Sequence, residues 1–171
     1  YSVHDLSRIG SSKKKLLALV ESNTFDLNDV PEEFELSEIQ LNQIKVHRRG
    51  VPMIDQGGIR AELEGLAYPL YFFDYETLAP AVPMFTGYTA YQRIPFQFSL
   101  HILKEKGGTL EHVEYLHMDA SDPAEEIIKL LDQHILPGGT LVSWNKSFEA
   151  GVNKEMAERL PQYAPVLERL N

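Results

Sequence analysis

The chain has 171 residues, of which 43% are hydrophobic, so it can bury a core, and one main domain is expected. It contains no cysteine, which excludes disulfides, thiolate metal sites and a cysteine nucleophile, and is typical of a reducing cytoplasm. The formal net charge of −9 argues against a nucleic-acid partner, although a carboxylate site that binds divalent cations loses much of its negative charge locally.

Residues 1–66 are predicted to form a small helical connector. Lysines and leucines over residues 13–21 indicate one helix, and the capping-box pattern of residues 37–40 begins a second helix that should end near residue 49. The segment 51–58 contains one proline and two adjacent glycines, so we expect a loop there.

From residue 67 the pattern changes to strands that alternate with helices. The first strand is apolar on both sides and should be central and buried, and the glycine pair at 107–108 should close a hairpin between the second and third strands. The expected strands cover residues 69–75, 96–103, 110–117 and 140–144, and the expected helices begin at Pro123 and Asn145. The fold class is therefore α/β, with the first and fourth strands adjacent and parallel.

Two acidic residues end the first strand. Asp74 and Glu76 are two residues apart, so their carboxylates point to the same side of the strand, and Glu149 at the start of the last helix can join them. Clustered carboxylates repel one another unless a divalent cation neutralises them, and Mg²⁺ or Mn²⁺ favours oxygen ligands. Paired ions of this kind activate water and stabilise the leaving oxygen in phosphodiester cleavage. For Glu149, a simple preference of acids for the first turn of a helix remains an alternative.

The spacing of these residues resembles that of the DEDD 3′–5′ exonucleases of the ribonuclease-H-like superfamily. The first exonuclease motif matches Asp74 and Glu76, and the second matches Asn145, Phe148 and Glu149, where Glu replaces the usual Asp. The resemblance implies a ribonuclease-H-like mixed sheet with flanking helices. It also implies that Asp74, Glu76 and Glu149 are catalytic residues and ligands of two Mg²⁺ or Mn²⁺ ions.

A closer resemblance is to a bacterial domain-of-unknown-function family that is found behind RecB-like nuclease domains. The resemblance covers about residues 68–160 and is strongest in three stretches, residues 73–77, 80–83 and 91–101. It implies that a RecB-like nuclease domain is a partner within the same parent polypeptide. Residues 1–66 would then be the connector, and residues 67–171 the exonuclease-type domain.

The exonuclease pattern requires a fourth carboxylate in a third motif, and nothing in residues 162–171 matches that motif. We therefore expect that the C-terminal part of the fold is missing and that the isolated 171-residue fragment is nearly inactive. The first residue is Tyr1 rather than Met, which also indicates a piece of a longer polypeptide. No residue can be assigned the role of general base, which the third motif supplies in the superfamily.

Four further residues are candidates for contacts with a nucleic-acid strand: Asn145, Tyr88, Tyr91 and Gln97. Asn145 is favoured as a helix cap, and Gln97 as part of the polar side of a half-exposed strand. Tyr88 and Tyr91 lie on a proline-rich stretch beside the predicted site, where they can stack on bases. Trp144, at the end of the expected strand 140–144, is expected in the core by periodicity.

The leading prediction for function is a metal-dependent 3′–5′ exonuclease that acts on single-stranded DNA or RNA. The alternative is a non-catalytic ribonuclease-H-like module that binds nucleic acid or a partner nuclease domain, which the acidic charge and the missing third motif favour. A third class, a small phosphoester hydrolase, would require a closed pocket. No apolar run approaches the length of a membrane span, so we expect no membrane association.

Overall fold

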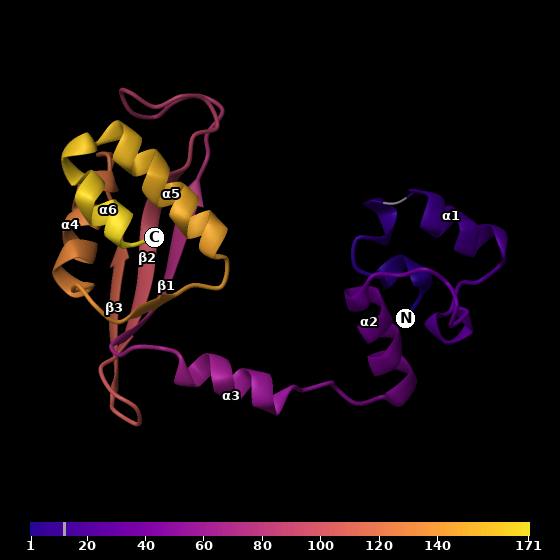
Figure 1. Cartoon of the computed structure of the whole chain (residues 1–171). Coiled ribbons are helices and arrows are strands. Elements are labelled where there is room, and N and C mark those ends of the chain that lie inside the picture. Colours follow the sequence, from indigo (N-terminus) through magenta and orange to yellow (C-terminus); the bar gives the residue numbers. More distant parts are fainter. Residues whose placement is uncertain (12) are drawn as a thin grey trace. The chain divides into compact units, whose positions relative to one another are not determined.

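A computed structural model describes residues 1–11 and 13–171 of the chain (Figure 1). The described residues form two compact units, Tyr1–Arg60 and Ala61–Asn171, so the division falls six residues before the boundary predicted after residue 66. Among the helices of the described residues, none is long and apolar enough to cross a membrane.

The first unit is built from two helices and three short 3-10 turns around a small apolar core. The bounds are η1 Val3–Asp5, η2 Ile9–Ser11, α1 Lys13–Glu21, η3 Leu27–Asp29 and α2 Glu38–Arg49. The predicted helices over 13–21 and 38–49 are confirmed. The predicted capping box is also present, because the Ser37 and Gln40 side chains each accept a hydrogen bond from the other residue's backbone N–H.

The prediction of a loop over residues 51–58 is wrong at its C-terminal end, because helix α3 covers Gln56–Glu64. The Asp55 side chain explains the difference: its Oδ1 accepts a hydrogen bond from the Gly58 N–H at 2.9 Å. An acidic cap of this kind satisfies a backbone donor of the first turn and offsets the low helix propensity of the two glycines.

The second unit is a four-stranded mixed sheet with its helices. The strands are β1 Leu70–Leu78, β2 Ile94–Leu103, β3 Leu110–Leu116 and β4 Thr140–Val142, and the helical elements are α4 Ala124–His134, α5 Lys146–Arg159, η4 Pro161–Tyr163 and α6 Ala164–Arg169. The strand order is β3-β2-β1-β4, with β1 antiparallel to β2, β2 antiparallel to β3, and β1 parallel to β4. The predicted α/β class, the hairpin and the parallel pairing of the first and fourth strands are confirmed.

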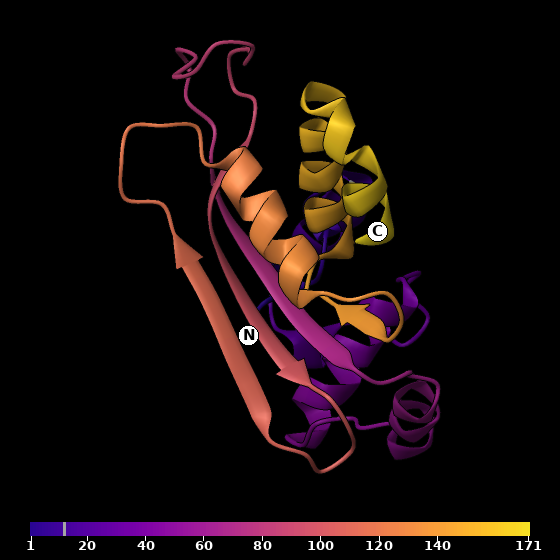
Figure 2. The same cartoon turned by 90° about the vertical axis from the view of Figure 1, so that its left-hand side faces the viewer.

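The helices α4, α5 and α6 all pack on one face of this sheet (Figure 2). On that face, Tyr71, Phe73 and Tyr75 of β1 are buried against the helices together with Phe98 of β2. The next residue along β1 on the opposite side, Phe72, is 38% exposed. The prediction that β1 is buried on both faces is therefore wrong: one face is covered, and the other presents Phe72 to solvent.

Strand β4 is shorter than predicted, and this shapes the edge of the sheet. It ends at Val142, which lies beside Phe72, so no strand covers that side of β1 beyond Phe72. The chain turns at this point, and helix α5 begins at Lys146. Asp74 is the second residue of β1 past the end of β4, so the start of α5 can approach it.

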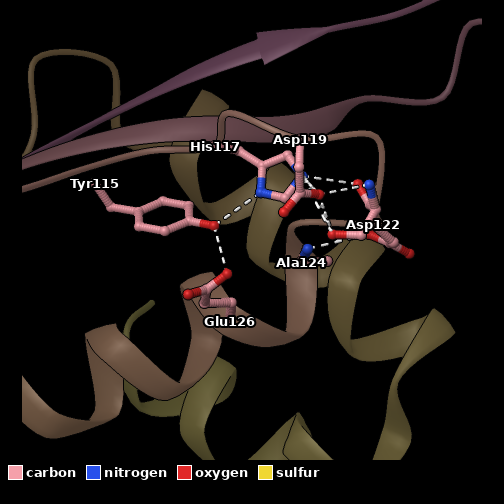
Figure 3. A network of polar contacts seen from close by, with 7 residues as sticks. Tyr115, His117, Asp119, Asp122, Ala124 and Glu126 are labelled. Atoms are coloured by element: carbon pink, nitrogen blue, oxygen red, sulfur yellow. Dashed lines mark hydrogen bonds and ion pairs between the residues drawn. The ribbon is translucent and has the colours of Figure 1, made fainter.

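The loop between β3 and α4 is fixed by a network of polar contacts (Figure 3). The Tyr115 hydroxyl donates a hydrogen bond to Glu126 at 2.6 Å and contacts Nδ1 of His117 at 2.8 Å. Asp122 accepts from the Ala124 N–H and forms an ion pair with Arg159 of α5 at 2.9 Å. The side chain of Asp122 therefore caps α4 and also joins this loop to α5.

The turn before β4 gives a direct test of how β4 is placed. Gly138 and Gly139 both have positive φ, but a Cβ at Gly139 would overlap the Pro69 carbonyl oxygen, whereas a Cβ at Gly138 would meet nothing within 4 Å. We expect Gly138→Ala to cost about 1 kcal/mol of unfolding free energy from backbone strain alone. Gly139→Ala should cost about 2–4 kcal/mol, because steric overlap adds to the strain. Urea unfolding measures both, and equal losses would contradict the close approach of this turn to β1.

Candidate metal centre

Asp74 and Glu149 meet at the edge of the sheet beyond the end of β4. Asp74 lies on the face of β1 that the helices leave open, and Glu149 lies in the first turn of α5. The Asp74 carboxylate is close enough for its charge to affect Glu149. The parallel pairing of β1 and β4 explains this approach, since it directs the chain that leaves β4 toward the carboxyl-terminal half of β1.

Glu149 is the most buried acidic side chain of the second unit, with 3% of its surface exposed. Its Oε2 atom is buried and has no hydrogen-bond partner among the described residues. Burial raises the pKa of Glu149 above its ordinary value, and the nearby charge of Asp74 raises it further. A buried carboxylate oxygen without a partner is uncommon in folded proteins and indicates that a bound group can complete its environment.

The Glu149 side chain borders a small cavity of about 50 Å³, which Ser143, Lys146 and Asn171 also line. This volume exceeds the roughly 10–15 Å³ that one water molecule requires, so it has room for a cation and a water. The hydroxyl and amide oxygens of Ser143 and Asn171 are ligands that Mg²⁺ and Mn²⁺ accept. Lys146 is a competing cation in the same cavity.

The structure brings Asp74 and Glu149 together, but it does not bring the predicted third carboxylate to them. Glu76 is exposed and lies opposite Gln97 of β2, next to an irregularity in the strand pairing between Glu76 and Thr77. Across residues 1–11 and 13–171, no group of three His, Cys, Asp or Glu side chains is placed to hold a metal ion. The role of Glu76 as a ligand stays a prediction.

Three of the four residues predicted to contact a substrate strand are at least partly exposed to solvent. Asn145 is the N-cap residue of α5, but its side chain makes no capping hydrogen bond; its Oδ1 instead accepts from the Ser147 hydroxyl at 2.9 Å. Tyr91 is 71% exposed, and Gln97 is half-buried on β2. Their contacts with a nucleic-acid strand stay predictions.

Tyr88 does not have the free ring that base stacking would require. Its side chain is buried at 8% exposure, its hydroxyl donates to Asp122 at 3.1 Å, and the Arg159 guanidinium lies over its ring at 4.1 Å. Burial, together with the charge of Asp122, raises the pKa of Tyr88. The proline-rich stretch folds back onto the α4 and α5 region at this residue, so Tyr88 packs there and is not free to bind a base.

The prediction that Trp144 belongs to the core is also wrong. Its side chain is 102% exposed, the highest value among the large hydrophobic residues of the described chain. The prediction assumed that strand alternation continues to residue 144, but β4 ends two residues earlier at Val142. The indole therefore projects into solvent beside the carboxylate pair.

Arg93, which sequence reasoning missed, holds the first turn of α5. Its guanidinium donates twice to Oε1 of Glu155, at 3.0 Å and 2.5 Å, and once to the Phe148 carbonyl oxygen at 3.3 Å. A Cβ at Gly151 would clash with the guanidinium, so only glycine fits there without a shift. A usable signal was the position of Arg93 directly before the apolar start of the second strand, because an arginine that becomes partly buried there requires an acidic partner.

A second missed contact joins α5 to β1 and to the C-terminal helix. The Tyr75 hydroxyl donates to Oδ1 of Asn153 at 2.9 Å, and Nδ2 of Asn153 donates to Oδ1 of Asn171 at 3.0 Å. Asn153 is fully buried. Burial raises the pKa of Tyr75, and the charge of Glu149 raises it further. A buried asparagine one turn after Glu149 therefore fixes the rotation of α5.

The second unit is thus an α/β domain in which two acidic side chains meet at one edge of a mixed sheet. The chain belongs to the family described as a domain of unknown function, DUF2779, whose family model matches residues 71–171, well over half of the chain. No curated protein and no solved structure matches the chain. The family membership agrees with the resemblance drawn from residues 73–77, 80–83 and 91–101.

Two arginines with similar contacts, one of them in α5 itself, provide a matched test of how the first turn of α5 is anchored. Arg93 and Arg159 each pair with a carboxylate and lie over an aromatic ring, but only Arg93 contacts the first turn of α5. We expect Arg93→Met and Arg159→Met each to cost about 1–3 kcal/mol of stability. Only Arg93→Met should speed amide hydrogen exchange at Phe148 and Glu149 selectively. Equal acceleration in both variants would show that Arg93 has no local effect.

The burial of Glu149 predicts that the difference in stability between wild type and Glu149→Gln depends on pH. The pKa of Glu149 in the folded protein lies above its ordinary value of 4.5. Above pH 4.5 this group ionises more readily in the unfolded chain than in the folded one, so the free energy of unfolding falls as the pH rises. In chelator at neutral pH, Glu149→Gln should therefore be about 1–3 kcal/mol more stable than wild type, and the difference should vanish in acid, where Glu149 is neutral. Thermal unfolding at the two pH values measures this, with the exposed Glu158→Gln as control. A destabilised Glu149→Gln at neutral pH would contradict it.

Proposed function

We propose that the second unit is a metal-dependent nuclease domain of the ribonuclease-H-like kind, which hydrolyses phosphodiester bonds of single-stranded DNA or RNA. The observation that carries the proposal is the buried, unpartnered Oε2 of Glu149 beside the Asp74 carboxylate. The strand order β3-β2-β1-β4, with β1 parallel to β4, is consistent with it. The 3′–5′ direction of attack rests on the resemblance of the motifs alone.

The residues present fit a hard divalent cation. Asp74 and Glu149 supply anionic oxygens, the adjoining cavity of about 50 Å³ has further oxygen donors, and repulsion between the two carboxylates falls when a cation lies between them. When bound, Mg²⁺ or Mn²⁺ activates a water and stabilises the leaving oxygen of a phosphodiester. The resemblance calls for two ions, with Glu76 as a further ligand.

The protein's own contribution is to place this pair and to desolvate Glu149. Arg93 fixes the first turn of α5 at the Phe148 carbonyl, and Asn153 fixes the rotation of the helix, so the Glu149 carboxylate is held in one position. The burial of Glu149 lowers the local dielectric, which strengthens every electrostatic interaction at that point. Asn145 directly precedes α5, and its exposed side-chain amide is a candidate contact for a substrate strand.

The second candidate function is a non-catalytic module that binds nucleic acid or an adjoining nuclease domain of the RecB-like kind. The observation that favours it is that the described residues contain no group of three metal-binding side chains, although two-metal hydrolysis usually requires more than two carboxylates. The net charge of −9 also weakens electrostatic binding of phosphate groups.

Metal binding gives the direct test of the proposed function. We expect the 171-residue chain to bind Mn²⁺ in calorimetry, and Asp74→Asn and Glu149→Gln each to weaken that binding by about tenfold or more, because each removes an anionic ligand. The exposed Glu158→Gln on the same helix α5 should leave it unchanged. Unchanged Mn²⁺ binding in both ligand variants would contradict the site.

Cleavage separates the two candidate functions. Because the 171-residue chain alone is expected to be nearly inactive, the assay uses a longer polypeptide that adds the expected third motif. End-labelled single-stranded DNA and RNA are incubated with it and Mg²⁺ or Mn²⁺, and the products are resolved by length. Stepwise shortening that Asp74→Asn abolishes supports the nuclease. Binding of the same strands without shortening, under every divalent cation that binds the chain, supports the non-catalytic module.

A further inference from the structure

The open face of the sheet carries a hollow that ends at Asp74. Its volume is about 550 Å³, within the range of ligand pockets. Two aromatic rings, two hydroxyls, an imidazole and a carboxylate contribute to its lining, from Phe72, Trp144, Ser99, Ser143, His101 and Asp74. Asp74 thus belongs both to this hollow and to the carboxylate pair, so a molecule in the hollow lies directly beside the proposed reaction site.

Aromatic rings dominate the accessible surface of the hollow. Trp144 is fully exposed, and Phe72 is 38% exposed although it lies in the middle of a central strand. Trp144 is also the single tryptophan of the chain. Large aromatic rings are normally buried, so a fully exposed indole next to a second open ring offers apolar faces for another flat molecule.

The histidine that lines the hollow is held in a fixed orientation. His101 of β2 stacks on His112 of β3 with ring centroids 4.2 Å apart and an interplanar angle of 10°. His112 in turn contacts the Ser99 hydroxyl through Nε2 at 3.2 Å. The imidazole of His101 is therefore a preorganised planar group in the hollow, and it loses little side-chain freedom when a ligand binds.

The charges around the hollow select the neutral part of a nucleotide. Among the residues that the structure describes, no lysine or arginine lines the hollow, and Asp74 contributes a carboxylate, so a phosphate group there would be repelled. The polar groups are instead the hydroxyls of Ser99 and Ser143 and the ring of His101, which suit the neutral edges of a base. The phosphate belongs on the other side of Asp74, where a cation would neutralise it.

We propose that this hollow binds a nucleobase of a single strand, stacked on Trp144, while the adjoining phosphodiester lies at the Asp74–Glu149 pair. The proposal rests on the proposed function for the position of the phosphate. Stacking on an aromatic ring tolerates every base, so this subsite favours unpaired strands without a sequence preference. It also supplies affinity that does not depend on positive charge, which suits a chain with a net charge of −9.

The fluorescence of Trp144 tests the proposal directly, because no other tryptophan contributes to the signal. In Ca²⁺, with electrophoresis to show that the strand stays intact, a short oligothymidylate should quench the emission. An abasic oligodeoxynucleotide of the same length, which has the phosphates without the bases, should not. Equal quenching by the two probes would overturn base stacking. Acrylamide quenching of the free protein gives a second check: if acrylamide does not reach Trp144, the hollow is covered by protein and the proposal is overturned.

Substitutions give the affinity of the subsite by anisotropy of a labelled oligothymidylate. Trp144→Leu should weaken binding by about tenfold to a hundredfold, the usual contribution of one stacked base. Trp144→Phe should retain most of the affinity, and Met118→Ala is the control, because Met118 is 82% exposed and does not line the hollow. Unfolding of each variant is measured first, and an unchanged affinity in Trp144→Leu would overturn the proposal.

The outcome for the subsite is separate from the outcome for the nuclease. Cleavage of single strands without any quenching of Trp144 would overturn the subsite and leave the proposed function intact. Quenching by the oligothymidylate and not by the abasic strand, with no cleavage under any divalent cation by the longer polypeptide that adds the third motif, would support the subsite and overturn the nuclease.

Discussion

Glu149 is buried with its carboxylate beside that of Asp74, and the chemistry available at this edge of the sheet depends on that contact. Burial and the nearby charge of Asp74 both raise the pKa of Glu149, and a cation between the two carboxylates would relieve the repulsion. Most surface acids relieve such repulsion by turning to solvent, but Glu149 cannot do so because α5 is fixed on both sides. Arg93 holds its first turn and Asn153 holds its rotation.

The sequence predicted the architecture well because its signals were local and strong. The capping box at Ser37, the glycine pair of the hairpin, and the alternation along β2 each depend on neighbouring residues alone, and each is confirmed. Asp74 and Glu149 were also found from sequence, through the register of their motifs. Their proximity follows from the parallel pairing of β1 and β4, which the order of the elements already indicated.

The errors come from contacts that act over long distances in the chain. Trp144 was assigned to the core because strand alternation was extended two residues too far, and only the length of β4 decides where the alternation stops. Tyr88 lies in a proline-rich stretch that reads as exposed, but Asp122 and Arg159, far along the chain, bury it. Arg93 was overlooked for the same reason, because its partner Glu155 is 62 residues away.

A crystal of the chain soaked in Mn²⁺ tests the central claim most directly, because the anomalous signal of manganese locates the ion without reference to activity. The account predicts a peak between the Asp74 and Glu149 carboxylates, with metal–oxygen distances of about 2.0–2.2 Å, near those of Mg²⁺. An ion bound elsewhere on the acidic surface would contradict it. So would a Glu149 carboxylate paired with the Lys146 ammonium, with no ion at the edge of the sheet.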